Sequence, residues 1–242
     1  MAAERRDGPR ERWTRLDVVL TVLHVQAPRD QRPQMEPLWN HLREDALDSA
    51  ATLRMRRNGV RVGLGREEWW DAVKAALDAV EGVRSNTLDP VRVPAGYPLA
   101  LELDEQPRDQ TLFFVAPDGV LSGETWPQSR NVLRVSYELD FIQRDELRLT
   151  VAPEVRQRLD GWRWVRTAEG VSQTPNYNGR VVSAAAFDVG LSPGEFLVVA
   201  PGPQADLYGL VGGALLVREL DGRPFDSYVF LRADVNHVAR GN

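Results

Sequence analysis

The chain has 242 residues, a formal net charge of −5 at pH 7 and a sequence pI near 5.4. Hydrophobic residues make up 43% and charged residues 27%, which is ordinary for a globular protein with a hydrophobic core. The acidic balance argues against a nucleic-acid partner, and the absence of cysteine excludes disulfides and thiolate metal sites.

The first third of the sequence predicts a small α/β unit at residues 16–90. Residues 1–15 precede it as a charged segment that we expect to be a disordered tail. The predicted elements are, in chain order, a strand at 16–26, helices at 35–47 and 49–57, a strand at 60–64 and a helix at 66–80. In the last helix Trp70, Val73 and Leu77 recur on one stripe, which is typical of a helix packed on a core.

Residues 91–242 predict a mainly antiparallel β domain, so the whole chain is expected to be of the α+β class. Candidate strands lie at 99–103, 111–116, 132–142, 146–151, 163–166, 180–189, 195–200, 214–218 and 227–233. Turn signals separate them, among them Asp160-Gly161 and Asn178-Gly179. A Ser-Pro-Gly turn at 192–194 between two apolar runs predicts a hairpin.

The sequence offers little reactive chemistry. His24, His41 and His237 show no metal-ligand spacing, and no serine occupies a nucleophile elbow. A Gly-Leu-Gly run at 63–65 stands between a predicted strand and helix, where anions can bind, but the next glycine of a dinucleotide fingerprint is missing. We therefore expect no catalytic residue, cofactor or metal, and a protein that is not an enzyme.

Three tryptophans are the candidate interface or stacking residues. Trp162 and Trp164 fall on one face if their segment is extended. They could stack on a sugar, sit at a lipid–water boundary, fill a groove between subunits or pack on the protein's own core. Trp69 and Trp70 point to different sides of one helix, and Trp70 belongs to the buried stripe. Trp69 is thus expected at a second contact or partly exposed.

The back half of the chain carries motifs that resemble a known family. The run LRLTVAPEV at 147–155 is followed by NGRVV at 178–182 and PGEFLVV at 193–199, and the chain continues to SYVFLRADV at 227–235. A Tyr-Gly-Leu element stands at 208–210. On these motifs the segment 132–238 resembles the C-terminal pore-forming region of secretins, the ring-forming proteins of bacterial outer membranes. The N-terminal unit is similar in kind to the small ring-building modules that precede that region.

The resemblance implies a non-enzymatic structural subunit of a self-associating, ring- or pore-forming assembly of the bacterial cell envelope. Its partners would be copies of itself and other envelope proteins, with membrane contact left open. Residues 187–191 and 196–199 are apolar on both faces or end abruptly, so we expect strand edges that a neighbouring copy covers. The sequence as written contains no export signal, and the cytoplasm is the alternative location. The alternative function is a soluble β-rich carbohydrate- or protein-binding module that uses Trp162 and Trp164.

Overall fold

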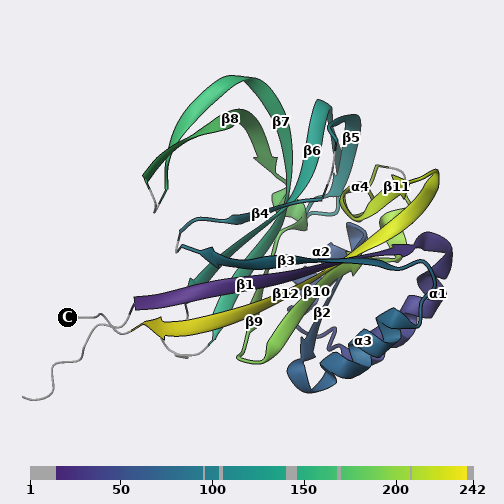
Figure 1. Ribbon diagram of the computed structural model, residues 1–242. Coiled ribbons are helices and arrows are strands. Elements are labelled where there is room, and N and C mark those ends of the chain that lie inside the picture. The colour runs from purple at the N-terminus through teal and green to yellow at the C-terminus, as the bar shows by residue number, and fades with distance from the viewer. Residues whose placement is uncertain are drawn as a thin grey trace, which may run out of the picture.

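A computed structural model describes residues 15–94, 96–103, 106–139, 146–167, 170–207 and 209–238, and these residues form two six-stranded antiparallel sheets (Figure 1). The tail expected at residues 1–15 lies outside this description except for Arg15, at which the first strand begins. The predominance of antiparallel strands confirms that the protein is β-rich.

Sheet A joins strands from both ends of the chain. In spatial order it contains β2 (Val60–Arg66), β10 (Glu195–Pro201), β12 (Arg223–Val238), β1 (Arg15–Pro28) and β3 (Arg84–Val93), and β11 (Val217–Leu220) pairs with one end of β12. The strand predicted at 16–26 is β1, and its interior position fits its apolar side chains on both faces. Sheet A therefore contains strands from both sides of the domain boundary that the sequence predicts near residue 90.

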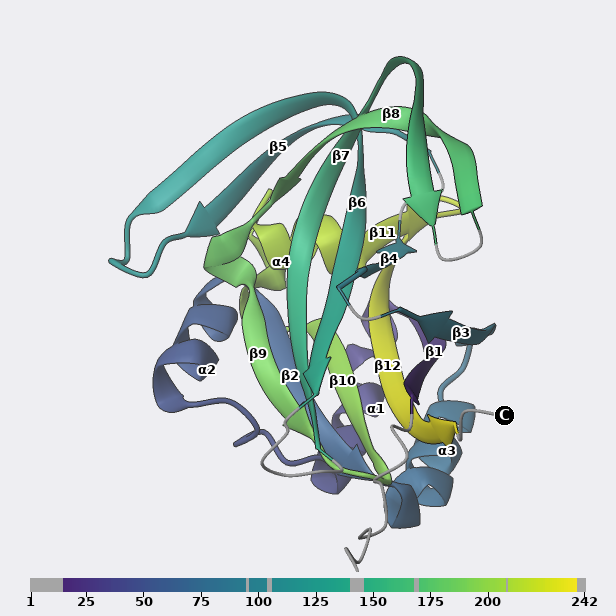
Figure 2. The same cartoon turned by 90° about the vertical axis from the view of Figure 1, so that its left-hand side faces the viewer.

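Sheet B contains the two longest strands. Its members are β4 (Leu99–Glu102), β5 (Arg108–Val115), β6 (Leu121–Leu139), β7 (Leu147–Thr167), β8 (Gly170–Val181) and β9 (Phe187–Leu191). β6 and β7 have 19 and 21 residues, whereas the sequence predicted short strands here. They pair with each other only between residues 129–139 and 147–157. Beyond that stretch they diverge into two ribbons, β5–β6 and β7–β8 (Figure 2).

Helical segments cover the outer face of sheet A, and one further helix lies beside β2. α1 (Arg32–Met35) continues into a 3-10 helix (Glu36–His41), and a 3-10 turn (Glu67–Trp69) leads into α3 (Trp70–Asp78). The helix predicted at 35–47 is wrong in its second half, because the backbone becomes extended at Leu42. α2 (Ser49–Arg57) matches the prediction, and the Asp48 carboxylate caps it by accepting a 2.7 Å hydrogen bond from the Ala51 N–H.

The main core lies between the two sheets. It combines side chains of β1, β2, β10 and β12 with side chains of β6, β7 and β9. A second core lies between sheet A and the helices α1 and α3, and a third lies under the β5–β6 ribbon against α4 (Val211–Leu216). Asn58, which is fully buried, links α2 to that ribbon by accepting from the Val115 N–H at 2.8 Å and donating to the Val115 carbonyl at 3.0 Å.

Four further expectations for residues 132–233 are corrected. The turn at 192–194 does not close a hairpin, because β9 pairs with β7 in sheet B and β10 lies between β2 and β12 in sheet A. Residues 196–199 consequently have no free edge, whereas β9 is paired on one side only among the described strands. The strand expected at 180–189 is interrupted by a 3-10 turn (Ser183–Ala185), and the strand expected at 214–218 is half helix.

Candidate interaction surfaces

The β7–β8 ribbon projects from sheet B as two strands that no other described element covers (Figures 1 and 2). Arg158 pairs with Tyr177 and Trp162 with Pro175, so β7 holds three residues where β8 holds one. Gly161, at φ 88°, provides the left-handed conformation that this bulge requires. The ribbon bends over in both views (Figures 1 and 2), which is the usual effect of a bulge. The Asp160-Gly161 and Asn178-Gly179 signals, predicted as chain turns, lie within β7 and β8.

Trp162 and Trp164 lie on this ribbon with most of their surface in solvent. Trp162 is 58% exposed and Trp164 is 71% exposed. They are two positions apart on β7 and oppose Pro175 and Gln173 of β8, so both indoles lie on one face of the ribbon. Neither indole packs on the protein's own core. Stacking on a sugar, a place at a lipid–water boundary and a place in a groove between subunits stay as the alternatives.

Trp69 belongs to a different region. It is half-buried at the end of the 3-10 turn before α3, with the Arg66 guanidinium 5.5 Å from its ring centroid. α3 and the β7–β8 ribbon lie at opposite ends of the molecule in both views (Figures 1 and 2). The structure therefore does not bring Trp69 together with Trp162 and Trp164.

An aromatic pocket that the sequence did not reveal lies beside α3 on the outer face of sheet A. Its volume is about 240 Å³, and Trp70 stands edge-on to Phe196 and Phe230 at centroid distances of 5.2 and 5.9 Å. Gly65 makes room for this cluster, since a Cβ there would lie 2.1 Å from the Phe196 ring. Gly63 likewise faces Trp39 and Leu42. The two glycines serve side-chain packing, and nothing in their surroundings indicates an anion site.

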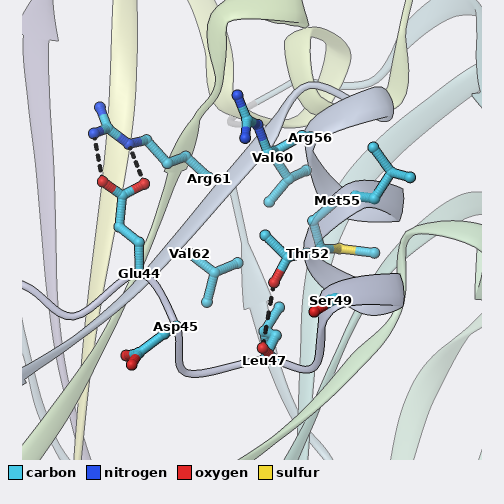
Figure 3. Close-up of a pocket in the computed structure, with 11 residues that line it drawn as sticks. Glu44, Asp45, Leu47, Ser49, Thr52, Met55, Arg56, Val60, Arg61 and Val62 are labelled. Carbon is cyan, nitrogen blue, oxygen red and sulfur yellow. Dashed lines mark hydrogen bonds and ion pairs between the residues drawn. The ribbon is translucent and has the colours of Figure 1, made fainter.

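A larger cavity of about 590 Å³ opens between β2 and α2 (Figure 3). Val60 and Val62 line it from the strand, and Thr52 and Met55 line it from the helix. At one side Arg61 donates two hydrogen bonds to Glu44, at 2.9 and 2.7 Å. These bonds hold the pKa of the Glu44 carboxyl below its usual value.

Two polar side chains, Asp226 and His24, are largely buried in the fold. Asp226, 1% exposed, accepts two hydrogen bonds from Arg32, at 2.6 and 2.9 Å, and lies 3.6 Å from Arg29. His24 on β1 is largely buried, and burial together with the positive charge of Arg218 lowers its pKa from 6.5 to about 4. His24 is therefore neutral near pH 7.

In the part of the chain that the structure describes, no three histidine or acidic side chains converge as metal ligands. Within the same residues no helix is long and apolar enough to cross a membrane.

Comparison with known proteins gives matches in solved structures only. No protein-family model and no curated protein matches the chain. One similar structure is the outer-membrane complex of the Klebsiella pneumoniae type II secretion system with PulD, PulS and the PulC HR domain, with 11% identity and a TM-score of 0.22. Others are Aeromonas hydrophila ExeD, with 9% identity and a TM-score of 0.26, and the secretin GspD of E. coli K12, with 13% and 0.24.

These matches cover 92%, 93% and 92% of this chain and 40%, 49% and 50% of the respective neighbours. The chain thus spans half or less of the length of each. TM-scores of 0.22 to 0.26 describe a weak likeness between this structure and secretin structures.

Proposed function

We propose that this protein is a non-enzymatic structural subunit that associates with copies of itself, in a ring or pore of the bacterial cell envelope. The observation that carries the proposal is the β7–β8 ribbon with Trp162 and Trp164 exposed on one face. The motifs at 147–155, 178–199 and 227–235, which resemble those of secretins, support the envelope location and the ring as parts of this proposal.

A two-stranded ribbon without a second layer is marginally stable in water. The outer part of the β7–β8 ribbon has ten strand residues on β7, at 158–167, which extend over roughly 30 Å. Val171 is also 62% exposed there. Large apolar side chains grouped on such an element usually mark an interface, and a neighbouring subunit would supply the missing layer.

The free edges of strands are a second argument for self-association. Within the described residues β8 and β9 are each paired on one side only, and both lie at an edge of sheet B. The outer edge of β5 is held by other parts of the chain, because the Phe113 N–H donates to the Gly209 carbonyl and the Val115 N–H donates to Asn58. Unpaired edges bind further strands unless they are blocked. A head-to-tail contact that repeats by rotation closes into a ring and leaves no free edge. β3, by contrast, carries Pro90 and charged residues, which discourage pairing.

The second candidate is a soluble module that binds a carbohydrate or a protein through the same two tryptophans. Indole rings on one face of a strand pair can stack on sugar rings. In that case replacing both tryptophans would abolish ligand binding without changing the mass of the protein in solution.

Mass in solution tests the proposal. Sedimentation velocity of the purified chain at micromolar concentration, in buffer and in detergent, is expected to show a species many times heavier than the monomer. A monomer under both conditions would contradict self-association.

A further inference from the structure

The outer edge of β2 presents unpaired backbone groups to the cavity between β2 and α2. Leu64 exchanges two hydrogen bonds with Arg43, at 2.8 and 2.9 Å, so its N–H and C=O point away from β10. Backbone groups alternate sides along a strand, and those of Val62 and Val60 therefore point outward as well. No hydrogen bond from a described residue outside sheet A reaches them.

The chain leaves this edge where strand pairing could have continued. After Arg43 it runs through residues 44–47 into α2 and bypasses the outward groups of Val62 and Val60. Figure 3 shows Met55 and Thr52 on the helix opposite Val60 and Val62, with Leu47 on the loop that leads into the helix. The result is a slot about 590 Å³ in volume with a strand edge on one wall and a helix on the other.

The residues that line the slot indicate the polarity and charge of a segment that could bind there. Leu53, 49% exposed, adds apolar surface from α2. Arg61 is already held by Glu44 and Glu36, whereas within the described residues neither Arg56 nor Asp45 forms an ion pair. Arg56 stands beside Val60 and Asp45 at the other end of the slot (Figure 3). The slot is thus apolar in its middle, with a cation at one end and an anion at the other.

We propose that this slot binds a lone extended segment of a partner protein, which adds to sheet A as a strand beside Val60 and Val62. Main-chain hydrogen bonds to a free strand edge, with pockets for alternate side chains, are an established way of binding peptides. The segment is proposed to run antiparallel to β2, the direction that Arg43 takes in its bridge to Leu64. A basic residue near its N-terminus then meets Asp45, and an acidic residue near its C-terminus meets Arg56. An edge strand of a folded sheet does not fit, because α2 occupies the place of its next strand.

The probe is the synthetic peptide acetyl-TKVIVET-amide, labelled with a fluorophore and titrated with the full chain by anisotropy. Wild-type protein is expected to bind it. Val62→Pro removes the outward N–H without touching the bonds to β10, and Val62→Ala retains it. We expect Val62→Pro to weaken binding at least tenfold more than Val62→Ala. Equal binding by the two variants would refute strand addition.

A charge exchange tests the direction and does not depend on a proline variant that folds. Arg56→Glu is expected to weaken binding of the probe about tenfold, and a probe with lysine in place of its glutamate should restore it. Arg57→Glu, one position further along α2 and outside the slot, is the matched control and should have little effect.

No binding of the probe by wild-type protein up to about 1 mM, a free energy near −4 kcal/mol, overturns the inference, as does an equal effect of Arg56→Glu and Arg57→Glu. The mass of the protein in solution is a separate readout. Failure of the peptide to bind would leave the proposal of self-association standing, and a monomeric mass would leave the proposal of peptide binding standing.

Discussion

Replacing Trp162 and Trp164 together by alanine should dissociate the assembly without unfolding the subunit. Because the two indoles are 58% and 71% exposed, their removal leaves no cavity in the core. Surface substitutions of this kind usually change the free energy of unfolding by less than about 0.5 kcal/mol. Any large effect must therefore arise where the ribbon contacts another molecule.

The magnitude follows from the exposed area. A tryptophan buries up to about 250 Å², so the two exposed fractions correspond to roughly 320 Å² that an interface could cover. At about 25 cal/mol per Å² this is a gross stabilisation near 8 kcal/mol. Ordering costs reduce the net effect, and interface tryptophans typically contribute about 2–4 kcal/mol each on truncation. A loss of 4 kcal/mol per contact corresponds to roughly a thousandfold weaker association.

Sedimentation velocity over a concentration series measures this effect directly, and urea unfolding of the same sample reports on the subunit. Leu207→Ala, at another exposed side chain (61%), is the matched control and should leave assembly unchanged. A double variant that assembles like the wild type would refute the assignment of the ribbon as the interface. Loss of a bound glycan or protein with unchanged mass would favour the binding module instead.

Three other predictions concern the stability of the subunit. The His24 pKa is 6.5 in an unfolded chain and about 4 in the fold, so the free energy of unfolding should fall by about 3 kcal/mol as pH drops through this interval, and His24→Gln should flatten that slope in urea titrations. Asp226→Asn removes a buried charge from its arginine partners and should cost about 3–5 kcal/mol by thermal unfolding, while Asp221→Asn at an exposed pair should cost less than about 1 kcal/mol. Gly65→Ala places a Cβ against the Phe196 ring and should cost about 1–3 kcal/mol; an unchanged urea midpoint would contradict that packing.

Local signals in the sequence were sufficient for several elements of the fold. The helix at 49–57 has a capping aspartate before it and Asn58-Gly59 after it, and the structure shows it with those bounds. Gly59, at φ 74°, ends the helix as expected for a left-handed stop. The strand predicted at 16–26 is also present, and the apolar side chains on both of its faces fit its position inside the sheet.

Pairing partners could not be predicted from the same signals. The turn at 192–194 has the chemistry of a hairpin, but turn residues do not determine whether the next strand stays in the same sheet. Here the chain crosses from β9 in sheet B to β10 in sheet A. Predicting this crossing would require knowledge of which faces of the two sheets are buried against each other. Asp160-Gly161 similarly signals a left-handed residue, and a bulge uses such a residue as readily as a turn does.

The candidate surfaces were predicted only in part. The alternate spacing of Trp162 and Trp164 identified them as candidates in the sequence. Their exposure became evident only in the structure, where no described element covers the ribbon. The aromatic pocket and the slot beside β2 depend on contacts between residues far apart in sequence. Gly65 lies inside β2, where a glycine often marks close approach of another group, but the predicted strand ended at residue 64.

Negative-stain electron microscopy of the unaltered protein tests the central claim, that copies of this chain complete one another's sheets. Closed rings of uniform diameter are the predicted result, and they should disappear in the double tryptophan variant. A field of single small particles, at concentrations where sedimentation also shows monomer, would contradict the account.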